Sequence, residues 1–218
     1  MRSTSSPTTA KGFTLLELLI VIAIIAILAT IMVIVINPIE TLRRARDVQR
    51  LSDLSSVRTA IAMYMTVTPV PDLNGANPGT CYATPATATG RIYLSQLAAS
   101  TLISSVTYSG TNSSIVDGTG WIPVNLSAIA GGSPLAAYPQ DPSQGTATLS
   151  AAAMTASSTP VYRYACSDAP LAFEMTARLE SIAYGDTAAV RTGTNKMETD
   201  GGNNAGVYEV GTNLQIID

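Results

Sequence analysis

The sequence predicts an α+β fold in which a long N-terminal helix packs on a small antiparallel sheet with long loops. A 24-residue apolar run fills residues 13–36, and an apolar stripe at steps of three or four residues follows over residues 48–64. Such spacing is typical of one helix face. Three segments with nearly alternating apolar and polar residues predict strands at 160–167, 171–179 and 207–217. A sheet needs a covered face, and the helix stripe would cover it.

The apolar run is long enough to cross a membrane. As a helix it would span about 36 Å at ~1.5 Å per residue, and the hydrocarbon core is about 30 Å thick. A cleaved secretory signal has an apolar centre of only about 7–15 residues, followed by small residues at the cleavage site. Here the small residue, Gly12, precedes the run. A cut after Gly12 would therefore leave the membrane helix on the mature protein.

Glu17 is the only ionisable residue in this run. Its charge would cost roughly 2.5–3.5 kcal/mol at the centre of a membrane helix, so we expect a partner. A cut before Phe13 releases an α-amine that is cationic at neutral pH. Both groups lie near the same helix end, so we predict that Glu17 pairs with the amine of a staggered neighbouring chain, where paired charges are tolerated. The alternative is an acid without function that reaches to the lipid headgroups.

Residues 11–18, KGFTLLEL, resemble the class III signal of type IV pilins and type II secretion pseudopilins. The resemblance extends to about residue 60. It implies a pilin fold, and a prepilin peptidase that cuts after Gly12 and methylates Phe13. It also implies that Phe13 and Glu17 act in assembly of a helical homo-oligomeric filament, driven by an assembly platform and an ATPase.

Four parts of the chain follow from this resemblance and from the helix patterns. Asn37-Pro38 interrupts the helix, because proline lacks a backbone donor and clashes with the preceding turn. We predict a cleaved leader at residues 1–12 and a transmembrane polymerisation helix at residues 13–36. An amphipathic stalk helix at residues 37–66 and an extracytoplasmic globular head at residues 67–218 would follow. The stalk face at residues 51–65 should pack on the sheet. The stalk arginines are expected to contact lipid headgroups or acidic surfaces of neighbouring subunits; they are Arg43, Arg44, Arg46, Arg50 and Arg58.

Charge is divided unevenly along the chain. Residues 1–66 carry seven Lys and Arg against four Asp and Glu, a net of +3, and residues 67–218 carry five against eleven, a net of −6. The positive charges after the apolar run would place the C-terminal side in the cytoplasm by the positive-inside rule. We predict the opposite. By the resemblance the leader must face a cytoplasmic-side peptidase, and the two cysteines suit an oxidising exterior.

Composition restricts the possible chemistry. The chain contains no histidine, which excludes Ser-His and Cys-His catalytic arrangements and His-ligated metal sites. The predicted head is acidic, so we expect no direct nucleic-acid binding. No nucleophile motif or phosphate-binding loop stands out, and we expect no enzyme activity.

The remaining predictions concern the head. Residues 72–90 and 127–159 should be loops, residues 91–103 a short helix, and residues 119–126 a possible edge strand limited by Pro123.

The two cysteines, Cys81 and Cys166, could form a disulfide in an oxidising compartment, or remain as two free buried thiols. Residues 138–142, YPQDP, resemble a Pro-x-Asp-Pro turn of secretion pseudopilins. The resemblance also implies a possible calcium site in the last inter-strand loop, at Asp200, Asn203 and Asn204, whose oxygens suit Ca²⁺. An ordinary turn is the alternative there, and we expect no other cofactor.

We therefore predict a pilin: a single-pass protein of the cytoplasmic membrane that assembles into a surface pilus for adhesion, motility or DNA uptake. The long loops at residues 72–90 and 104–159 favour this over a type II secretion pseudopilin. A third reading is a single-span receptor that does not polymerise, which predicts tolerance of Glu17 substitution and no processing at Gly12.

Overall fold

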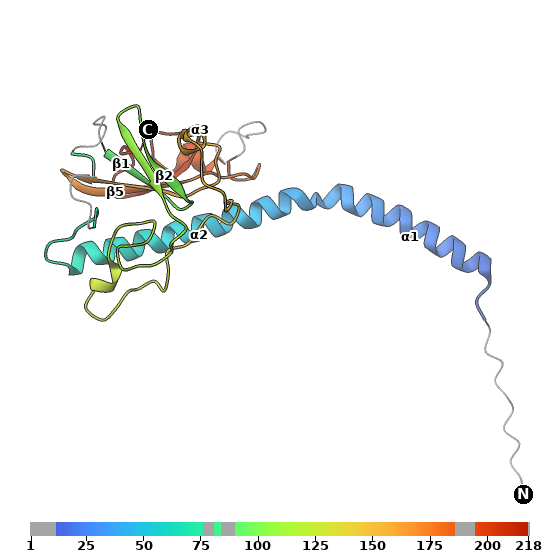
Figure 1. Ribbon diagram of the computed structural model, residues 1–218. Helices are drawn as coiled ribbons and strands as arrows, with labels where there is room; N and C mark the ends of the chain where they lie inside the picture. The colour runs from blue at the N-terminus through green and yellow to red at the C-terminus, as the bar shows by residue number, and fades with distance from the viewer. Residues whose placement is uncertain (1–11, 76–80, 84–89, 186–194, 218) are drawn as a thin grey trace, which may run out of the picture. The chain divides into compact units, whose positions relative to one another are not determined.

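The computed structural model describes residues 12–75, 81–83, 90–185 and 195–217. The chain divides into two compact units, residues 1–41 and residues 42–218. We call the second one the head unit. The boundary falls inside helix α2, and each unit is described by itself (Figure 1).

The first unit contains helix α1, Leu15–Ile36. Asn37 ends it in the left-handed conformation, with φ of 44°, and α2, Pro38–Val67, begins at the next residue. A proline is tolerated at the first helical position because its missing N–H would have no partner there. The predicted interruption at Asn37-Pro38 is therefore confirmed. By length and composition, the helix from Leu15 is apolar enough to cross a membrane.

The head unit is built on one six-stranded sheet with the order β2-β3-β1-β4-β5-β6. Strands β1 and β3 pair in parallel, and all other neighbours are antiparallel. The strands are β1 Gly90–Leu94, β2 Ala98–Ile103, β3 Val106–Gly110, β4 Arg163–Asp168, β5 Leu171–Ala177 and β6 Tyr208–Gly211. The predicted long helix on an antiparallel sheet is confirmed, with the one difference that β1 and β3 are parallel.

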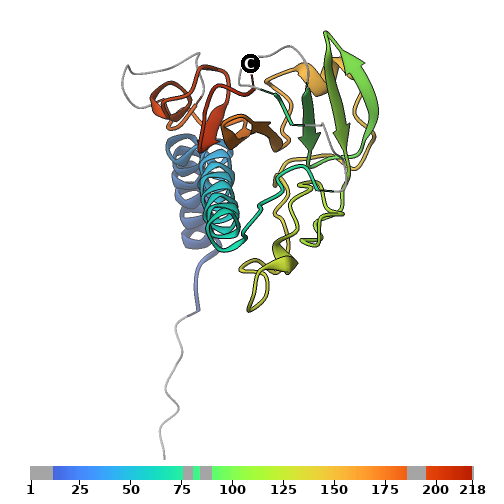
Figure 2. The same ribbon diagram turned by 90° about the vertical axis from the view of Figure 1, so that its left-hand side faces the viewer.

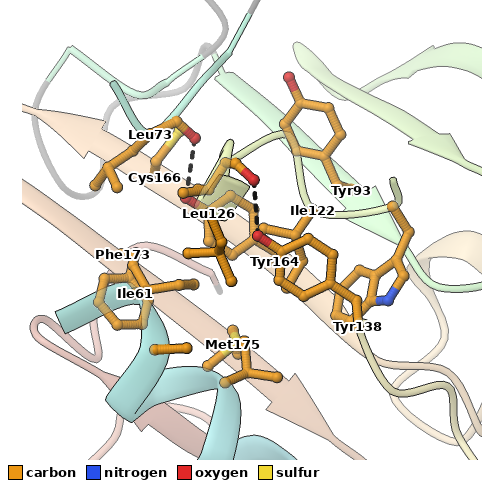
Figure 3. Packing of buried hydrophobic residues seen from close by; sticks show 14 of the residues in the cluster. Ile61, Leu73, Tyr93, Ile122, Leu126, Tyr138, Tyr164, Cys166, Phe173 and Met175 are labelled. Atoms are coloured by element: carbon orange, nitrogen blue, oxygen red, sulfur yellow. Dashed lines mark hydrogen bonds between the residues drawn. The ribbon is translucent and has the colours of Figure 1, made fainter. Parts of the chain in front are cut away.

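One face of this sheet is covered by α2 together with residues 111–138. Viewed along α2, the helix lies beside β5 and β6, and the irregular segment lies on the side of β1 (Figure 2). Ile61 of α2 is fully buried and belongs to one core cluster with Phe173 and Met175 of β5 (Figure 3). The apolar stripe is confirmed where it is buried, at Leu54, Val57, Ile61 and Tyr64, whereas Val48 is half exposed.

The opposite face carries a second core cluster. Ile92 and Leu94 of β1 and Ala165 of β4 point to this side. They are covered by the short helix α3, Ala151–Thr155, and by the C-terminal residues Ile216 and Ile217. Two further short helices are η1, Leu126–Ala128, and α4, Lys196–Thr199.

The predicted helix at residues 91–103 is wrong, because this segment forms β1 and β2. Tyr93 is buried in the first core cluster, whereas Ile92 and Leu94 are buried in the second. Successive side chains thus alternate between the two faces of the sheet, which is the period of a strand. Tyr93 and Leu94, which would share a helix face, therefore lie on opposite sides of the sheet.

Two other head predictions need correction. Residues 119–126 form no strand. Trp121 and Ile122 are consecutive and both fully buried, so buried and exposed side chains do not alternate as they would in a strand with one covered face. The expected surface loops at 127–159 include buried Tyr138 and Asp141, and α3. The three C-terminal strands are confirmed, but β6 ends at Gly211 rather than at residue 217.

Candidate functional site

The predicted processing site precedes α1 and is accessible. Gly12 has open space around it, with no atom within 4 Å of the position that a Cβ would take. Phe13 is 89% exposed. Both lie in non-helical backbone, and α1 begins only at Leu15. The Gly12–Phe13 peptide bond is therefore reachable without unfolding a helix.

Glu17 forms a capping box with Thr14 at the start of α1. Its Oε2 accepts hydrogen bonds from the Thr14 backbone N–H and hydroxyl, both at 2.9 Å, and its own N–H donates to Thr14 Oγ1 at 3.2 Å. A threonine followed three residues later by glutamate, before an apolar run, is the sequence signature of this box. This box was not predicted, although Thr14 and Glu17 carry its signature.

The capping box uses one oxygen of the Glu17 carboxylate. Both bonds from Thr14 reach Oε2, and Oε1 has no hydrogen bond among the described residues. An ionised carboxylate has about four acceptor positions. Glu17 thus accepts hydrogen bonds from Thr14 at the start of its own helix, and its Oε1 is left to accept from a further donor.

The rest of α1 presents an apolar surface. None of its residues is buried. The only polar side chain in the run besides the capping pair is Thr30, and its hydroxyl donates to the Ala26 carbonyl at 2.8 Å. Polar groups satisfied within the helix are what a lipid environment requires. The surface suits lipid or other helices of the same kind.

Comparison with known families agrees with this geometry. Residues 8–33 match the Prokaryotic N-terminal methylation motif. The match includes the Gly12–Phe13 bond, Glu17 and most of α1. Neither the curated proteins nor the solved structures contain a match to the chain.

An apolar N-terminal helix, a helix-covered sheet and this motif are together what a type IV pilin-like protein would have. The motif is consistent with the type IV pilins and pseudopilins, which are typically non-enzymatic structural proteins. It implies processing by prepilin peptidase, membrane anchoring and then assembly.

The predicted disulfide is present. Cys81 and Cys166 are bonded, with an S–S distance of 2.00 Å. The bridge joins a segment beyond α2 to strand β4, and both cysteines belong to the core that α2 covers. The alternative of two free thiols is therefore wrong.

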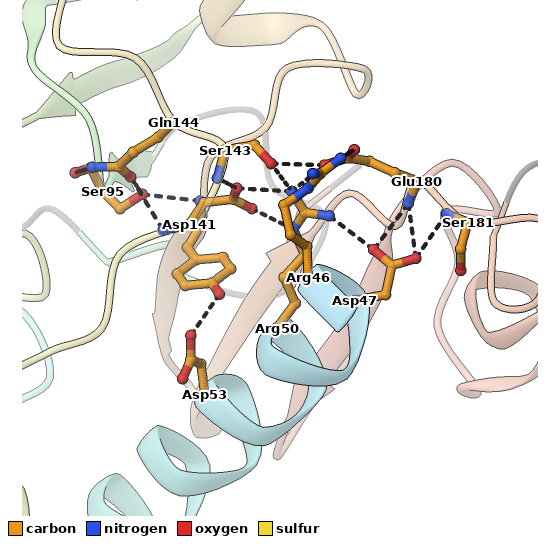
Figure 4. Close-up of polar contacts among 11 residues, drawn as sticks. Arg46, Asp47, Arg50, Asp53, Ser95, Asp141, Ser143, Gln144, Glu180 and Ser181 are labelled. Carbon is orange, nitrogen blue, oxygen red and sulfur yellow. Dashed lines mark hydrogen bonds and ion pairs between the residues drawn. The ribbon is translucent and has the colours of Figure 1, made fainter. Parts of the chain in front are cut away.

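A buried charge cluster ties α2 to the head unit (Figure 4). The guanidinium of Arg50 donates to Asp141 from Nε at 2.7 Å and from Nη2 at 2.8 Å, and to Asp47 from Nη1 at 2.8 Å. Nη2 also contacts Glu180 and donates to Ser143. The side chains of Arg50, Asp47 and Asp141 are fully buried. Burial alone would lower the pKa of Arg50, but the surrounding carboxylates outweigh it and raise the pKa.

This cluster corrects the expectation for two stalk arginines. Arg50 is directed into its own head unit, and Arg46 donates to Glu180 at 2.5 Å. The partner Asp141 lies in the segment that resembles a Pro-x-Asp-Pro turn, and Trp121 holds this segment by donating to the Pro139 carbonyl at 2.9 Å. The turn therefore supplies the buried carboxylate that the helix arginine needs.

The residues predicted for calcium lie between α4 and β6. Asp200 accepts hydrogen bonds from Gly202 N at 3.0 Å and Glu209 N at 2.7 Å, and Asn204 Oδ1 accepts from Gly206 N at 2.9 Å. These oxygens organise the loop itself, as in a turn built by Asx side chains. Calcium binding stays a prediction.

Two glutamates lie buried together on the sheet face opposite α2. In the ladder Glu174 of β5 stands opposite Gly211, and Glu209 of β6 stands opposite Thr176. Glu174 Oε2 accepts from the N–H groups of Ile216 and Ile217 at 2.7 and 2.9 Å. Glu209 is buried beside it, and the two neighbouring carboxyls favour the protonated form of Glu174.

This pair makes the head unit less stable as the pH rises. Burial, followed by the neighbouring Glu209 carboxyl, raises the pKa of Glu174 from 4.5 to about 9. Between these two values the folded state binds more protons than the unfolded state, so the free energy of unfolding falls with increasing pH. We expect Glu174→Gln to flatten this slope, because the amide oxygen still accepts from the C-terminal segment and the side chain no longer titrates. Denaturant unfolding of the full chain in detergent micelles, at pH 5, 7 and 9, measures the slope.

The matched control for this prediction is Glu198→Gln, at an exposed glutamate of α4. This variant should keep the wild-type slope. An unchanged slope in Glu174→Gln would show that Glu174 is ionised in the folded protein and would contradict the prediction.

Proposed function

We propose that this protein is the structural subunit of a type IV pilus-like surface filament. In this proposal residues 1–12 are a leader that a prepilin peptidase removes, and the new amino terminus at Phe13 is methylated. Residues 13–36 then hold the chain in the cytoplasmic membrane until they enter a bundle of like helices. An assembly platform and an ATPase supply the work, and the head units coat the filament.

The observation that carries this proposal is the state of Glu17. It is an acid at the start of a helix with no buried residue, and one of its carboxylate oxygens has no hydrogen bond among the described residues. Apolar burial cannot favour the bundle over the membrane, because lipid tails are as apolar as leucine. A specific pairing with the Phe13 amine of a neighbouring chain supplies both register and a reason to leave the lipid.

The disulfide supports the proposed topology. Disulfides persist outside the cytosol, where thiols are not kept reduced. Cys81 and Cys166 both follow the membrane helix in the chain and both belong to the head unit. If the head unit lies outside the cytoplasm and residues 1–12 lie on the cytoplasmic side, the disulfide can persist and the peptidase can reach its cleavage site.

Two substitutions at Glu17 test the pairing. Glutamine at the third position of a helix still forms a capping box, so Glu17→Gln keeps the start of α1 and removes only the charge. Glu17→Ala removes both. We expect the two variants to insert and to be cleaved before Phe13, but to yield no filaments. Electron microscopy of material sheared from the cell surface, with N-terminal sequencing of the subunit, measures both outcomes.

The control is again Glu198→Gln, which removes an exposed charge from the head unit and should leave filaments normal. Filaments from Glu17→Gln but not from Glu17→Ala would assign Glu17 to capping alone and overturn the charge pairing. An uncleaved wild-type chain that remains monomeric in the membrane would overturn the whole proposal in favour of a receptor. A processed subunit without surface filaments, whose loss blocks protein export, would identify a secretion pseudopilin.

A further inference from the structure

Arg163 of β4 is a buried cation to which the described residues supply no carboxylate partner. Arg163 is 4% exposed, and its side chain lies on the sheet face opposite α2. Nη2 donates to the Ala156 carbonyl at the end of α3, at 2.6 Å, whereas Nη1 has no hydrogen-bond partner in the described part of the chain. No ion pair involves Arg163 among the residues that the structure describes.

A small cavity adjoins this guanidinium. Its volume is about 20 Å³. Thr176 of β5 stands opposite Arg163 in the ladder and also lines the cavity. The Thr176 side chain is fully buried, and its hydroxyl likewise has no partner among the described residues. Two unsatisfied polar groups from neighbouring strands therefore line the same cavity.

The lining is rich in hydrogen-bond donors and contains no carboxylate. Arg163 supplies N–H groups and a positive charge, and Thr176 supplies a hydroxyl. Asn204 already uses its Oδ1 to accept from Gly206 N, so its amide nitrogen is left to donate. Burying a lone charge is costly unless an opposite charge accompanies it. Burial lowers the pKa of Arg163 only to about 10, so the side chain remains charged at neutral pH.

We propose that this cavity binds a small monovalent anion of the size of chloride, held by Arg163 Nη1 and the Thr176 hydroxyl. A cavity needs about 10–15 Å³ to hold one water molecule, so about 20 Å³ admits a single monatomic ion. Arg163 supplies a single positive charge, which matches a monovalent ion better than sulfate or phosphate. The ion neutralises Arg163 and links β4 and β5 to the loop before β6. This role is independent of filament assembly.

Thermal unfolding of the full chain in detergent micelles tests the proposal. Trp121 is the only tryptophan and is buried in the head unit, so its fluorescence reports unfolding of that unit. Chloride replaces gluconate at constant ionic strength. A ligand that binds only the folded state raises the unfolding midpoint in a saturable way. We expect this rise with chloride and with bromide, and none with sulfate.

Three variants locate the ion. Arg163→Met should abolish the chloride-dependent shift. Thr176→Val keeps the shape of the side chain and removes one hydrogen bond to a charged ligand, so it should weaken apparent chloride affinity roughly tenfold or more. Arg58→Met, at an exposed arginine of α2, should leave the shift unchanged.

Equal midpoints of the wild type in chloride and gluconate would mean that water fills the cavity, and would overturn the proposal. So would an unchanged chloride shift in Arg163→Met or in Thr176→Val. If Arg163→Met fails to fold, the Thr176→Val arm and broadening of the chloride NMR line by wild-type protein decide the question.

Discussion

Arg50→Met is expected to lower the free energy of unfolding of the head unit by about 3–5 kcal/mol. Removing one partner of a buried ion pair costs this much because the remaining charges stay buried without compensation. Here Asp47 and Asp141 are fully buried, and the guanidinium of Arg50 contacts both. Asp47 would keep its bonds from the backbone N–H groups of Glu180 and Ser181. The carboxylate of Asp141 would keep, among the described residues, only the hydrogen bond from the backbone N–H of Ser143.

Denaturant unfolding of the full chain, followed by Trp121 fluorescence, measures this loss. Arg50→Lys should be intermediate, because an ammonium keeps the charge but cannot form the bidentate contact with Asp141. Arg58→Met is the control and should change stability little, as is usual for exposed positions. A loss below about 1 kcal/mol in Arg50→Met would mean that the cluster is hydrated and contributes no more than a surface ion pair.

The double variant Cys81→Ala with Cys166→Ala should lower the stability of the head unit by about 4–5 kcal/mol. The two cysteines are 85 residues apart. In the chain-entropy model, opening a loop of this length restores unfolded-state freedom worth about that amount. The expected result is a lower denaturation midpoint for the variant than for the oxidised wild type.

Reductant supplies the matched control for this prediction. Reduced wild type and the double variant should unfold at similar denaturant concentrations, and the variant should not respond to reductant. A wild-type midpoint that is unchanged on complete reduction, verified by a mass increase of two hydrogens, would contradict the prediction. The unfolded chain would then already be compact around this loop.

Sequence patterns predicted the elements whose signals are local and regular. The run at residues 13–36, the break at Asn37-Pro38 and the buried stripe from Leu54 to Tyr64 all follow from a period or from the geometry of proline. The central strands β4 and β5 follow from alternation. In each case the signal lies within a few residues, so no distant contact is needed to read it.

Other elements could not be predicted because distant contacts decided them. Residues 91–103 carry spacing that fits a helix, but the pairing of β1 with β3 and β4 made the segment extended. Trp121 and Ile122 are buried without a strand because α2 and the sheet surround them. Local propensity is a weak guide where tertiary packing overrides it.

The candidate site shows the same division. Gly12, Phe13 and Glu17 were predicted from a motif within a short segment, and the capping box of Thr14 was equally visible there. The cluster around Arg50 was not visible, because its partners Asp141 and Glu180 are 91 and 130 residues distant along the chain.

By itself the sequence determined that this protein has a membrane-length apolar helix with one acid at its start, an amphipathic continuation, and an N-terminal methylation motif at residues 8–33. Only the tertiary structure decided which charges are buried and what they meet: Arg50 with its carboxylates, Glu174 with Glu209, and Arg163 with a small cavity. The physical reason is that the energy of a charge depends on its surroundings, and those come from segments that only folding brings together.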